Sequence, residues 1–249
     1  MPEQLLASWE KLKADFILNF VQGDRWRMLV TGLSNTLLIA FLACLIGIVL
    51  GIIVAVIRSS WDTNVKQSRH RGVLYHVMHI LNSVCKVYTT VIRGTPVVVQ
   101  LLIMFYIVFK TSRNGLLVAT LSFGLNSGAY VSEIIRSGIM SIDKGQMEAG
   151  RSLGFNYVQS MWYIITPQVL KNVLPPLANE FIVLLKETSV AAYVAVQDLT
   201  YAGNRIRGKT YSDFMPLIAV ALIYLLVVMF FTKLVSILER RLRESDNRS

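Results

Sequence analysis

Charged residues are scarce in this chain. Asp, Glu, Lys and Arg make up only 16% of its 249 residues, whereas 54% are hydrophobic and the mean hydropathy is +0.52. This balance excludes an ordinary soluble domain and indicates a membrane protein. Cysteine is scarcer still, and both Cys44 and Cys85 fall in or beside apolar runs. We interpret them as apolar side chains rather than as a disulfide framework.

Two functional classes also lack their signatures. No nucleophile, base and orienting residue form a set that would indicate an enzyme. The net charge of +10 is scattered over loops and ends, without the basic stripe interleaved with aromatics that is typical of nucleic-acid binding. His76 and His79, with His70 nearby, have no carboxylate or thiolate beside them, so we expect no metal site and no cofactor in this chain.

Hydrophobic runs predict about five membrane-spanning helices. The clearest run, from Asn35 to Ile57, is uncharged and about 34 Å long as a helix, which is enough to cross a bilayer core. It lies too far from the N-terminus for a signal peptide. Within it, Gly47 and Gly51 lie four residues apart, so a second helix could approach its backbone closely. The predicted spans cover about residues 30–57, 84–109, 116–139, 177–197 and 214–238.

An interfacial helix is expected before the first span, at about residues 5–22. Trp9, Leu12, Phe16 and Phe20 recur there at helical spacing, with charged residues between them. The predicted fold is therefore all-α: a polytopic membrane helix bundle, with residues 1–249 forming a single transmembrane domain.

The distribution of lysine and arginine predicts the orientation of this bundle. The loop at 58–72, the loop after the third span and the C-terminal end together carry 12 of them, against 9 on the other side. The larger count includes Lys66, Arg69, Arg71 and Arg248. Since basic residues accumulate on the cytoplasmic side, we expect these loops and the C-terminus to be cytoplasmic.

The cytoplasmic loop at 143–167 looks ordered rather than merely polar. Asp143 followed by Gln146, and Asn156 followed by Gln159, each fit a capping box at a helix start. Gly154, between them, suits the left-handed residue that ends a helix, and Pro167 is expected to stop the second helix. The segment therefore predicts two short helices joined by a sharp turn, with Glu148 and Arg151 of the first facing a partner.

The same segment resembles a known signature. "EAGRSLGFNYVQSMWYIITP" is similar to the pattern of permease subunits of bacterial ATP-binding cassette importers, with Gly150 and Thr166 replacing an alanine and a leucine of that pattern. The matching residues are Glu148, Ala149, Gly154, Ile164 and Pro167. Three further stretches, "VIRGTPVVVQLL" (91–102), "LNSGAYVSEIIRSGI" (125–139) and "LANEFIVLLKETSV" (177–190), resemble the polar amino acid branch of this family, over roughly residues 26–240.

The resemblance implies a transport subunit that is not an enzyme by itself. It implies a coupling helix at 144–154, docked in a cleft of a separate ATPase that binds ATP and magnesium, with contact residues Glu148, Ala149, Gly150, Arg151 and Gly154. It also implies a second permease subunit, identical or homologous, an extracytoplasmic substrate-binding protein and an amino acid substrate. The location would be the bacterial cytoplasmic (inner) membrane.

A second motif points elsewhere. "GNRIRGKT", from Gly203 to Thr210, matches the phosphate-binding loop pattern, in which Lys209 would contact phosphates and Thr210 magnesium. Taken alone it would indicate a membrane enzyme that hydrolyses nucleotide. However, the residues before it belong to a predicted span rather than to a buried strand, so we expect an exposed basic loop.

Polar residues within the spans are candidates for the substrate path. Asn126, Tyr130 and Glu133 fall on one face of the third span, and a carboxylate at membrane depth is expected to face the bundle interior or water. A salt bridge from Glu133 to Arg136 is an equally good interpretation.

Two other polar clusters leave alternatives open. Lys186, Glu187 and Thr188 interrupt the fourth span and could meet a zwitterionic substrate or form an ion pair between spans. Arg93, Gly94 and Pro96 could form a hinge or a static kink in the second span.

Overall fold

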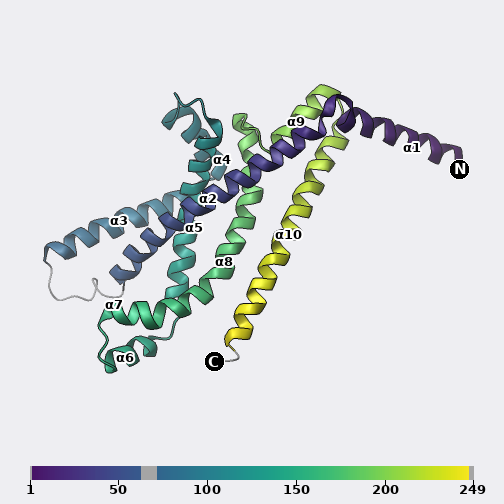
Figure 1. Cartoon of the computed structure of the whole chain (residues 1–249). Helices are drawn as coiled ribbons and strands as arrows, with labels where there is room; N and C mark the ends of the chain where they lie inside the picture. The colour runs from purple at the N-terminus through teal and green to yellow at the C-terminus, as the bar shows by residue number, and fades with distance from the viewer. Residues whose placement is uncertain (1, 63–71, 247–249) are drawn as a thin grey trace.

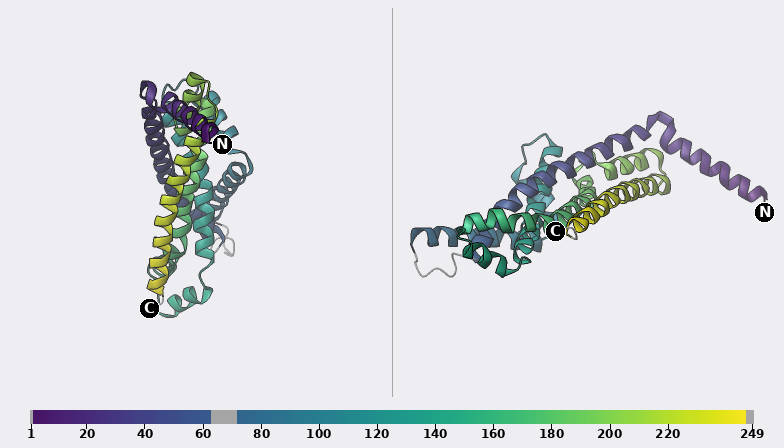
Figure 2. Two further views of the ribbon diagram at one scale, coloured as in Figure 1. Left: turned by 90° about the vertical axis from the view of Figure 1, so that its right-hand side faces the viewer. Right: turned by 60° about the horizontal axis from the view of Figure 1, so that its bottom comes forward.

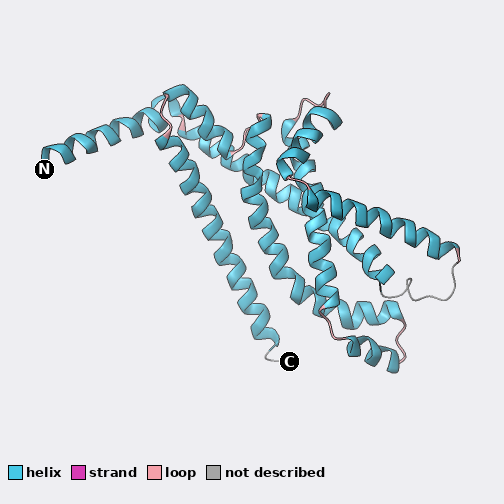
Figure 3. Cartoon of the chain, turned by 180° about the vertical axis from the view of Figure 1, so that it is seen from behind, coloured by secondary structure: helices cyan, strands magenta, loops and turns pink. Residues whose placement is uncertain are grey.

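The structure is a computed structural model that describes residues 2–62 and 72–246, and within these residues it contains helices and turns but no strands (Figure 3). Lys66, Arg69, Arg71, Arg248 and His70, used in the predictions above, lie outside the described residues. The α-helices are α1 (Pro2–Phe16), α2 (Trp26–Ser60), α3 (Val73–Gly94), α4 (Val97–Ile103), α5 (Gly115–Met140), α6 (Lys144–Ser152), α7 (Tyr157–Ser160), α8 (Thr166–Glu187), α9 (Leu199–Thr210) and α10 (Phe214–Asp246). Shorter π and 3-10 turns are η1 (Ile17–Val21), η2 (Gln22–Asp24), η4 (Met104–Val108), η5 (Met161–Ile165) and η6 (Thr188–Val194).

The long helices cross between two ends of the molecule. In Figure 1, α2, α5 and α10 descend while α8 rises between them, so that α6, α7, the end of α2 and the C-terminus share the lower end. The start of α2 and all of α9 lie at the opposite end. This arrangement agrees with the predicted topology, in which the loop after α2, the α6–α7 segment and the C-terminus share one side.

Only some of these helices are uniformly apolar. Among the described residues, α2 and α10 are each long and apolar enough to cross a membrane, and α3 with α4–η4 would count as a third span bent by 110°. The all-α membrane bundle is confirmed, whereas length and composition identify fewer membrane-spanning helices among the described residues than the five predicted. The helix α5 is not uniformly apolar, for a clear physical reason. Its polar residues, such as Ser122, Asn126 and Ser132, are buried inside the bundle, so this helix does not need a uniformly apolar sequence.

The helix at the fourth predicted span, about residues 177–197, has other bounds than that span. The helix α8 begins at Thr166, well before the expected 177, and ends at Glu187, after which the chain continues as the 3-10 turn η6. Pro167 does not stop a helix but lies in the first turn of α8. The first turn has no intrahelical partner for its N–H groups, so a proline is tolerated there.

The second predicted span is broken at Pro96. Thr95 has an extended backbone (φ −121°, ψ 146°), as expected before a proline, and Pro96 is the N-cap of α4. The predicted kink is confirmed, and whether it moves as a hinge stays a prediction.

The most extensive helix contact is the crossing of α2 and α5. A Cβ atom on Gly47 would lie 2.7 Å from Ser127 Oγ, and one on Gly51 would lie 2.7 Å from Val131 Cβ. Gly128, on α5, faces Leu50 at a similar 3.0 Å. The small-residue pair in α2 therefore permits the close helix approach that its spacing predicts.

The N-terminal helix α1 projects from the bundle (Figure 2). Trp9, Leu12 and Phe16 are exposed on it, and the predicted helix at 5–22 is divided at Phe16, where η1 begins. Gly23, with φ +67°, turns the chain toward α2. These exposed apolar side chains suit the predicted position in the membrane interface.

Candidate functional site

The helix α6 begins at an aspartate cap. Asp143 is its N-cap, and Asp143 Oδ1 accepts a hydrogen bond from Gly145 N at 2.6 Å. The predicted capping box with Gln146 is wrong, because the short Asp143 side chain caps the second helical residue instead of the third and Gln146 bonds to Gln168. One free N–H group at the helix start is still satisfied, so the helix begins where predicted.

The end of α6 is a Schellman turn. Gly154 has φ +84°, its N–H donates to Arg151 O (2.9 Å), and Phe155 N donates to Gly150 O (3.0 Å). The next helix starts with the predicted capping box, in which Asn156 and Gln159 exchange two hydrogen bonds of 2.9 Å. The helix, turn and helix predicted for this segment are confirmed.

Gly150 determines how α6 rests on the bundle. It is the buried residue of α6, and a Cβ there would lie 2.7 Å from Ser160 Oγ and 2.9 Å from Ile164 Cδ1. Gly150, which stands where the signature quoted above has an alanine, therefore allows α6 to approach α7 and η5 closely. Glu148, Ala149 and Arg151 are exposed on the outward side.

A cavity of about 520 Å³ separates α6 from the ends of α2 and α5. Met147 and Met161 contribute to its apolar wall, while Asp62, Arg136 and Lys144 contribute charges. The helix α6 is thus seated on the bundle along one edge, with room beside it.

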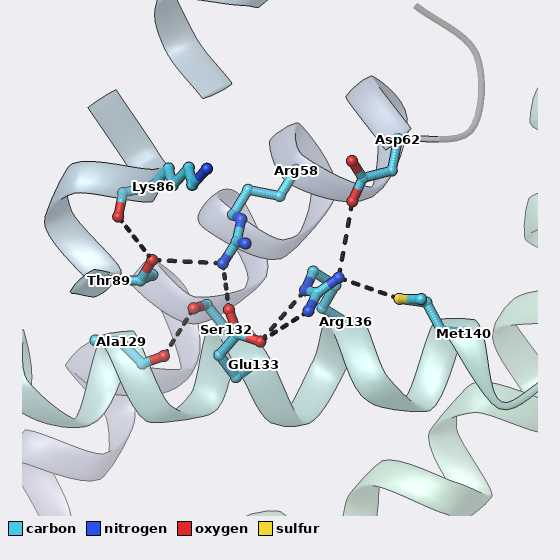
Figure 4. A network of polar contacts seen from close by, with 9 residues as sticks. All are labelled: Arg58, Asp62, Lys86, Thr89, Ala129, Ser132, Glu133, Arg136 and Met140. Atoms are coloured by element: carbon cyan, nitrogen blue, oxygen red, sulfur yellow. Dashed lines mark hydrogen bonds and ion pairs between the residues drawn. The ribbon is translucent and has the colours of Figure 1, made fainter. Parts of the chain in front are cut away.

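An ion network joins three helices next to this cavity (Figure 4). Glu133 of α5 accepts hydrogen bonds from Arg58 of α2 and from Arg136, whose Nη2 lies 3.1 Å from Glu133 Oε2. Arg58 Nη1 also donates to Thr89 Oγ1 of α3 (3.4 Å), and Arg136 Nη1 lies 3.7 Å from Asp62 Oδ2. The salt bridge to Arg136, one of the two interpretations above, is present, whereas the role of Arg58 was missed because it was counted only as a loop charge.

Glu133 also lines a polar cleft of about 500 Å³ between α3, α5 and α8. Tyr130 and Arg93 line it too, with the Arg93 guanidinium 5.5 Å from the centre of the Tyr130 ring. Glu180 of α8 completes the cleft; it is buried and accepts a hydrogen bond from Ser127 Oγ (3.0 Å). Glu180 was not among the predicted site residues, although a carboxylate inside a predicted span is a signal that points to such a site.

Asn126 lies apart from this cleft. Its side chain donates to Gln100 Oε1 (2.9 Å), and Gln100 Nε2 donates to Thr95 O and Ile92 O across the break between α3 and α4. Gln100 therefore satisfies carbonyl groups that the break leaves without helical partners. Arg93, one of the three residues predicted to form a hinge or a static kink, lines the cleft.

Lys186, Glu187 and Thr188 lie at the end of α8 rather than in the middle of a span. Lys186 is exposed and Glu187 half-buried, while Thr188 is buried and donates to Leu185 O (2.9 Å). None of the three lines the polar cleft.

The "GNRIRGKT" stretch is not a loop. It forms the last two turns of α9, whose N-cap is Asp198 and whose C-cap, Tyr211, has φ +53°. Lys209 is exposed, and Thr210 Oγ1 donates to Asn19 Oδ1 (2.7 Å). A phosphate-binding loop needs free amides at a strand-to-helix junction, whereas these amides belong to a helix, so the nucleotide-hydrolysing alternative is not supported.

Comparison with known proteins gives the same picture. Residues 47–244 match the family described as "Binding-protein-dependent transport system inner membrane component". The chain is 33% identical over 227 residues to the L-cystine transport system permease protein TcyB of Bacillus subtilis, covering 90% of both chains. It is 35% identical to the arginine transport system permease protein ArtQ of the same species, covering 88% of this chain and 94% of that one.

Solved structures share the fold. A crystal structure of an amino acid ABC transporter with histidines matches with a TM-score of 0.76 and 38% identity, over 86% of this chain and 94% of that chain. An inward-facing MetNI methionine ABC transporter, at 18% identity, matches with a TM-score of 0.73 over 88% and 98% and supports the fold alone. The chain therefore belongs to the binding-protein-dependent transport system inner membrane components and is a membrane-spanning permease subunit of an ATP-binding cassette importer.

Proposed function

We propose that this permease forms the translocation path for an amino acid and couples that path to ATP hydrolysis on a separate ATPase through α6. The observation that carries the coupling role is the seating of α6. Its inner side touches η5 and α7 at Gly150 with no space for a methyl group, and its outer side presents Glu148, Ala149 and Arg151. A push on the outer face would pass to α8, because α7 and η5 lead into that helix without a loop.

The polar cleft supports an amino acid as the substrate. Its walls carry the carboxylates of Glu133 and Glu180 and the guanidinium of Arg93. A zwitterion needs an anionic group near its ammonium and a cationic group near its carboxylate, and both are present. The relatives named for cystine and arginine transport favour the same substrate class.

The complete importer would contain further subunits. Permeases of this family work with ATPase and substrate-binding partners. For this chain we propose two ATPase subunits that bind ATP and magnesium, a second permease that is identical or homologous, and an extracytoplasmic substrate-binding protein. The complex would reside in the bacterial cytoplasmic membrane, with α6 on the cytoplasmic side.

Uptake into proteoliposomes tests the substrate path. Glu180→Gln removes a carboxylate that bonds to Ser127, without cutting an ion pair with Arg58 or Arg136, whereas Glu133→Gln also weakens the network of Figure 4. If the cleft carries substrate, Glu180→Gln should reduce uptake of cationic amino acids more than uptake of neutral ones, roughly tenfold for a lost charged contact.

The control is the melting temperature of each variant. A uniform loss of uptake for all amino acids, accompanied by a lower melting temperature, would assign Glu180 to structure and remove the cleft from the proposed path.

A further inference from the structure

The outward face of α9 has no role in the function proposed so far. This helix buries Leu199, Ala202 and Ile206 against α2 and α10, at the end of the bundle opposite α6 (Figure 1). Its other side presents Arg205 and Lys209 to solvent. The "GNRIRGKT" stretch therefore forms a basic surface. In the orientation of the proposed function, this surface lies at the extracytoplasmic end of the bundle.

A small recess lies on this surface between α2 and α9. Its volume is about 210 Å³, and six of its nine lining residues are polar. The nine are Arg27, Met28, Thr31, Gly32, Gln197, Asp198, Tyr201, Ala202 and Arg205. We call it the arginine recess, because Arg27 from α2 and Arg205 from α9 both line it.

The floor of the arginine recess is rigid. At Gly32 a Cβ atom would lie 2.6 Å from Asp198 O and 2.9 Å from Leu199 Cα, so the backbones of α2 and α9 are in direct contact. Asn35 Nδ2 donates to Gln197 O (2.8 Å), and Leu199 N donates to Thr36 Oγ1 (3.1 Å). Two hydrogen bonds and one close approach thus hold the start of α9 on α2.

The two arginines are available for an anion. The Arg27 guanidinium lies 5.5 Å from the Trp26 ring centre and 3.4 Å from Asp24, in an exposed ion pair of little energetic value. Among the described residues, no carboxylate pairs with Arg205. The recess carboxylate, Asp198, is wholly buried and accepts hydrogen bonds from Tyr201 N (2.7 Å) and Thr200 N (3.2 Å), so it does not occupy the arginines.

We propose that the arginine recess receives a carboxylate side chain of the extracytoplasmic substrate-binding protein when that protein docks. This proposal rests on the proposed function, which supplies such a partner. Guanidinium groups bind carboxylates in a bidentate geometry, and a recess of this size suits one side chain. A lipid phosphate would also attract arginine, and the experiment below distinguishes that anion from a protein carboxylate.

The test uses the complete importer in nanodiscs of phosphatidylcholine. The probe is the purified, ligand-loaded binding protein that stimulates ATP hydrolysis by the wild-type complex. Arg205→Glu and Arg27→Glu are compared with Lys209→Glu, which makes the same charge change on the same helix as Arg205 but outside the recess. Affinity is measured over a range of salt concentrations, together with basal ATP hydrolysis and the melting temperature.

We expect the two recess variants to weaken docking by roughly tenfold or more and to reduce its dependence on salt, with basal hydrolysis and melting temperature unchanged. Lys209→Glu should change the affinity for the binding protein by less than about threefold, because Lys209 lies outside the recess. Reversing the matching acidic residue of the binding protein to lysine should restore docking to Arg205→Glu.

Three results would overturn the proposal. Unchanged docking in both recess variants would remove the contact, and an equal loss in Lys209→Glu would replace the recess with general electrostatic attraction. Stabilisation of the wild type by phosphatidylglycerol that Arg205→Glu abolishes, with docking unchanged, would assign the recess to a lipid headgroup. A wild-type complex that no binding protein stimulates would instead contradict the proposed function itself.

Discussion

Replacing Gly51 by alanine tests whether the α2–α5 crossing sets the stability of this permease. The added Cβ would lie 2.7 Å from Val131 Cβ and 3.0 Å from the backbone nitrogen of Ser132. Carbon atoms in good contact lie about 3.5–4.0 Å apart, so α2 and α5 would have to separate by about 1 Å. Because one obstacle is backbone and the other a β-branched side chain, no rotamer change can relieve the contact.

The size of the effect follows from two opposing terms. Overpacking costs about 1–3 kcal/mol, and a separation of about 1 Å also loosens contacts at neighbouring glycines such as Gly128. Replacing glycine by alanine in a helix returns about 1 kcal/mol. We expect a net loss of about 1–2 kcal/mol, which corresponds to a melting temperature lower by about 2–8 °C for a chain of this length.

Gly208→Ala is the matched control. Gly208 is also helical, but it is exposed on α9 and a Cβ there would have nothing within 4 Å, so the same substitution should stabilise. The assay is the fraction of purified protein that elutes as a single peak in size-exclusion chromatography after heating. If Gly51→Ala melts at or above the wild-type temperature, close glycine packing does not hold α2 and α5 together.

Three further predictions concern α6, α9 and the orientation of the chain. Gly154→Val should abolish ATPase association and transport while leaving membrane insertion intact, because a β-branched residue is strained at φ +84°; Glu148→Ala should be milder, and normal complex formation by the valine variant would remove the coupling role. Burial raises the pKa of Asp198 to about 6, so its native state binds a proton more tightly than the unfolded chain, and its contribution to stability should fall as pH rises from about 4 to about 6, by on the order of 3 kcal/mol at most. Asp198→Asn should remove this pH dependence in thermal unfolding, Asp198→Ala should melt below Asp198→Asn by the value of the lost N-cap, about 1 kcal/mol, and an unchanged pH profile in both would contradict the assignment. A cysteine replacing Lys144 should react with an impermeant reagent only in opened cells, whereas one replacing Lys209 should react in intact cells; the reverse pattern would invert the proposed orientation.

The α6–α7 segment could be predicted in detail because its helix ends depend on residues that are close together in the sequence. A left-handed glycine at Gly154 and a capping box at Asn156 depend on residues within one or two helical turns, and both occur. The Asp143 cap was predicted with the wrong partner because the choice between Gly145 and Gln146 depends on side-chain geometry, which spacing alone does not determine. The replacement of an alanine by Gly150 gained its meaning only when Ser160 and Ile164 were seen against it.

The other features of the protein also divide into those set by short stretches of sequence and those set by contacts between distant helices. Apolar runs in the sequence by themselves predicted an all-α membrane protein, and the signature around Glu148 predicted its family. Both features lie within short stretches of the chain, so they do not depend on which distant residues pack together. The tertiary structure alone decided that Arg58 pairs with Glu133, that Glu180 faces the polar cleft and that Arg27 meets Arg205 in one recess. Each of these depends on which faces of two helices meet, and α2 and α9 meet through contacts between residues more than 160 positions apart in the chain, such as Thr36 and Leu199. Tertiary packing also explains why a sequence that matches a phosphate-binding loop is helical here. Burial of Leu199, Ala202 and Ile206 against α2 and α10 stabilises α9, whereas a match to a motif adds no interaction that would favour a loop.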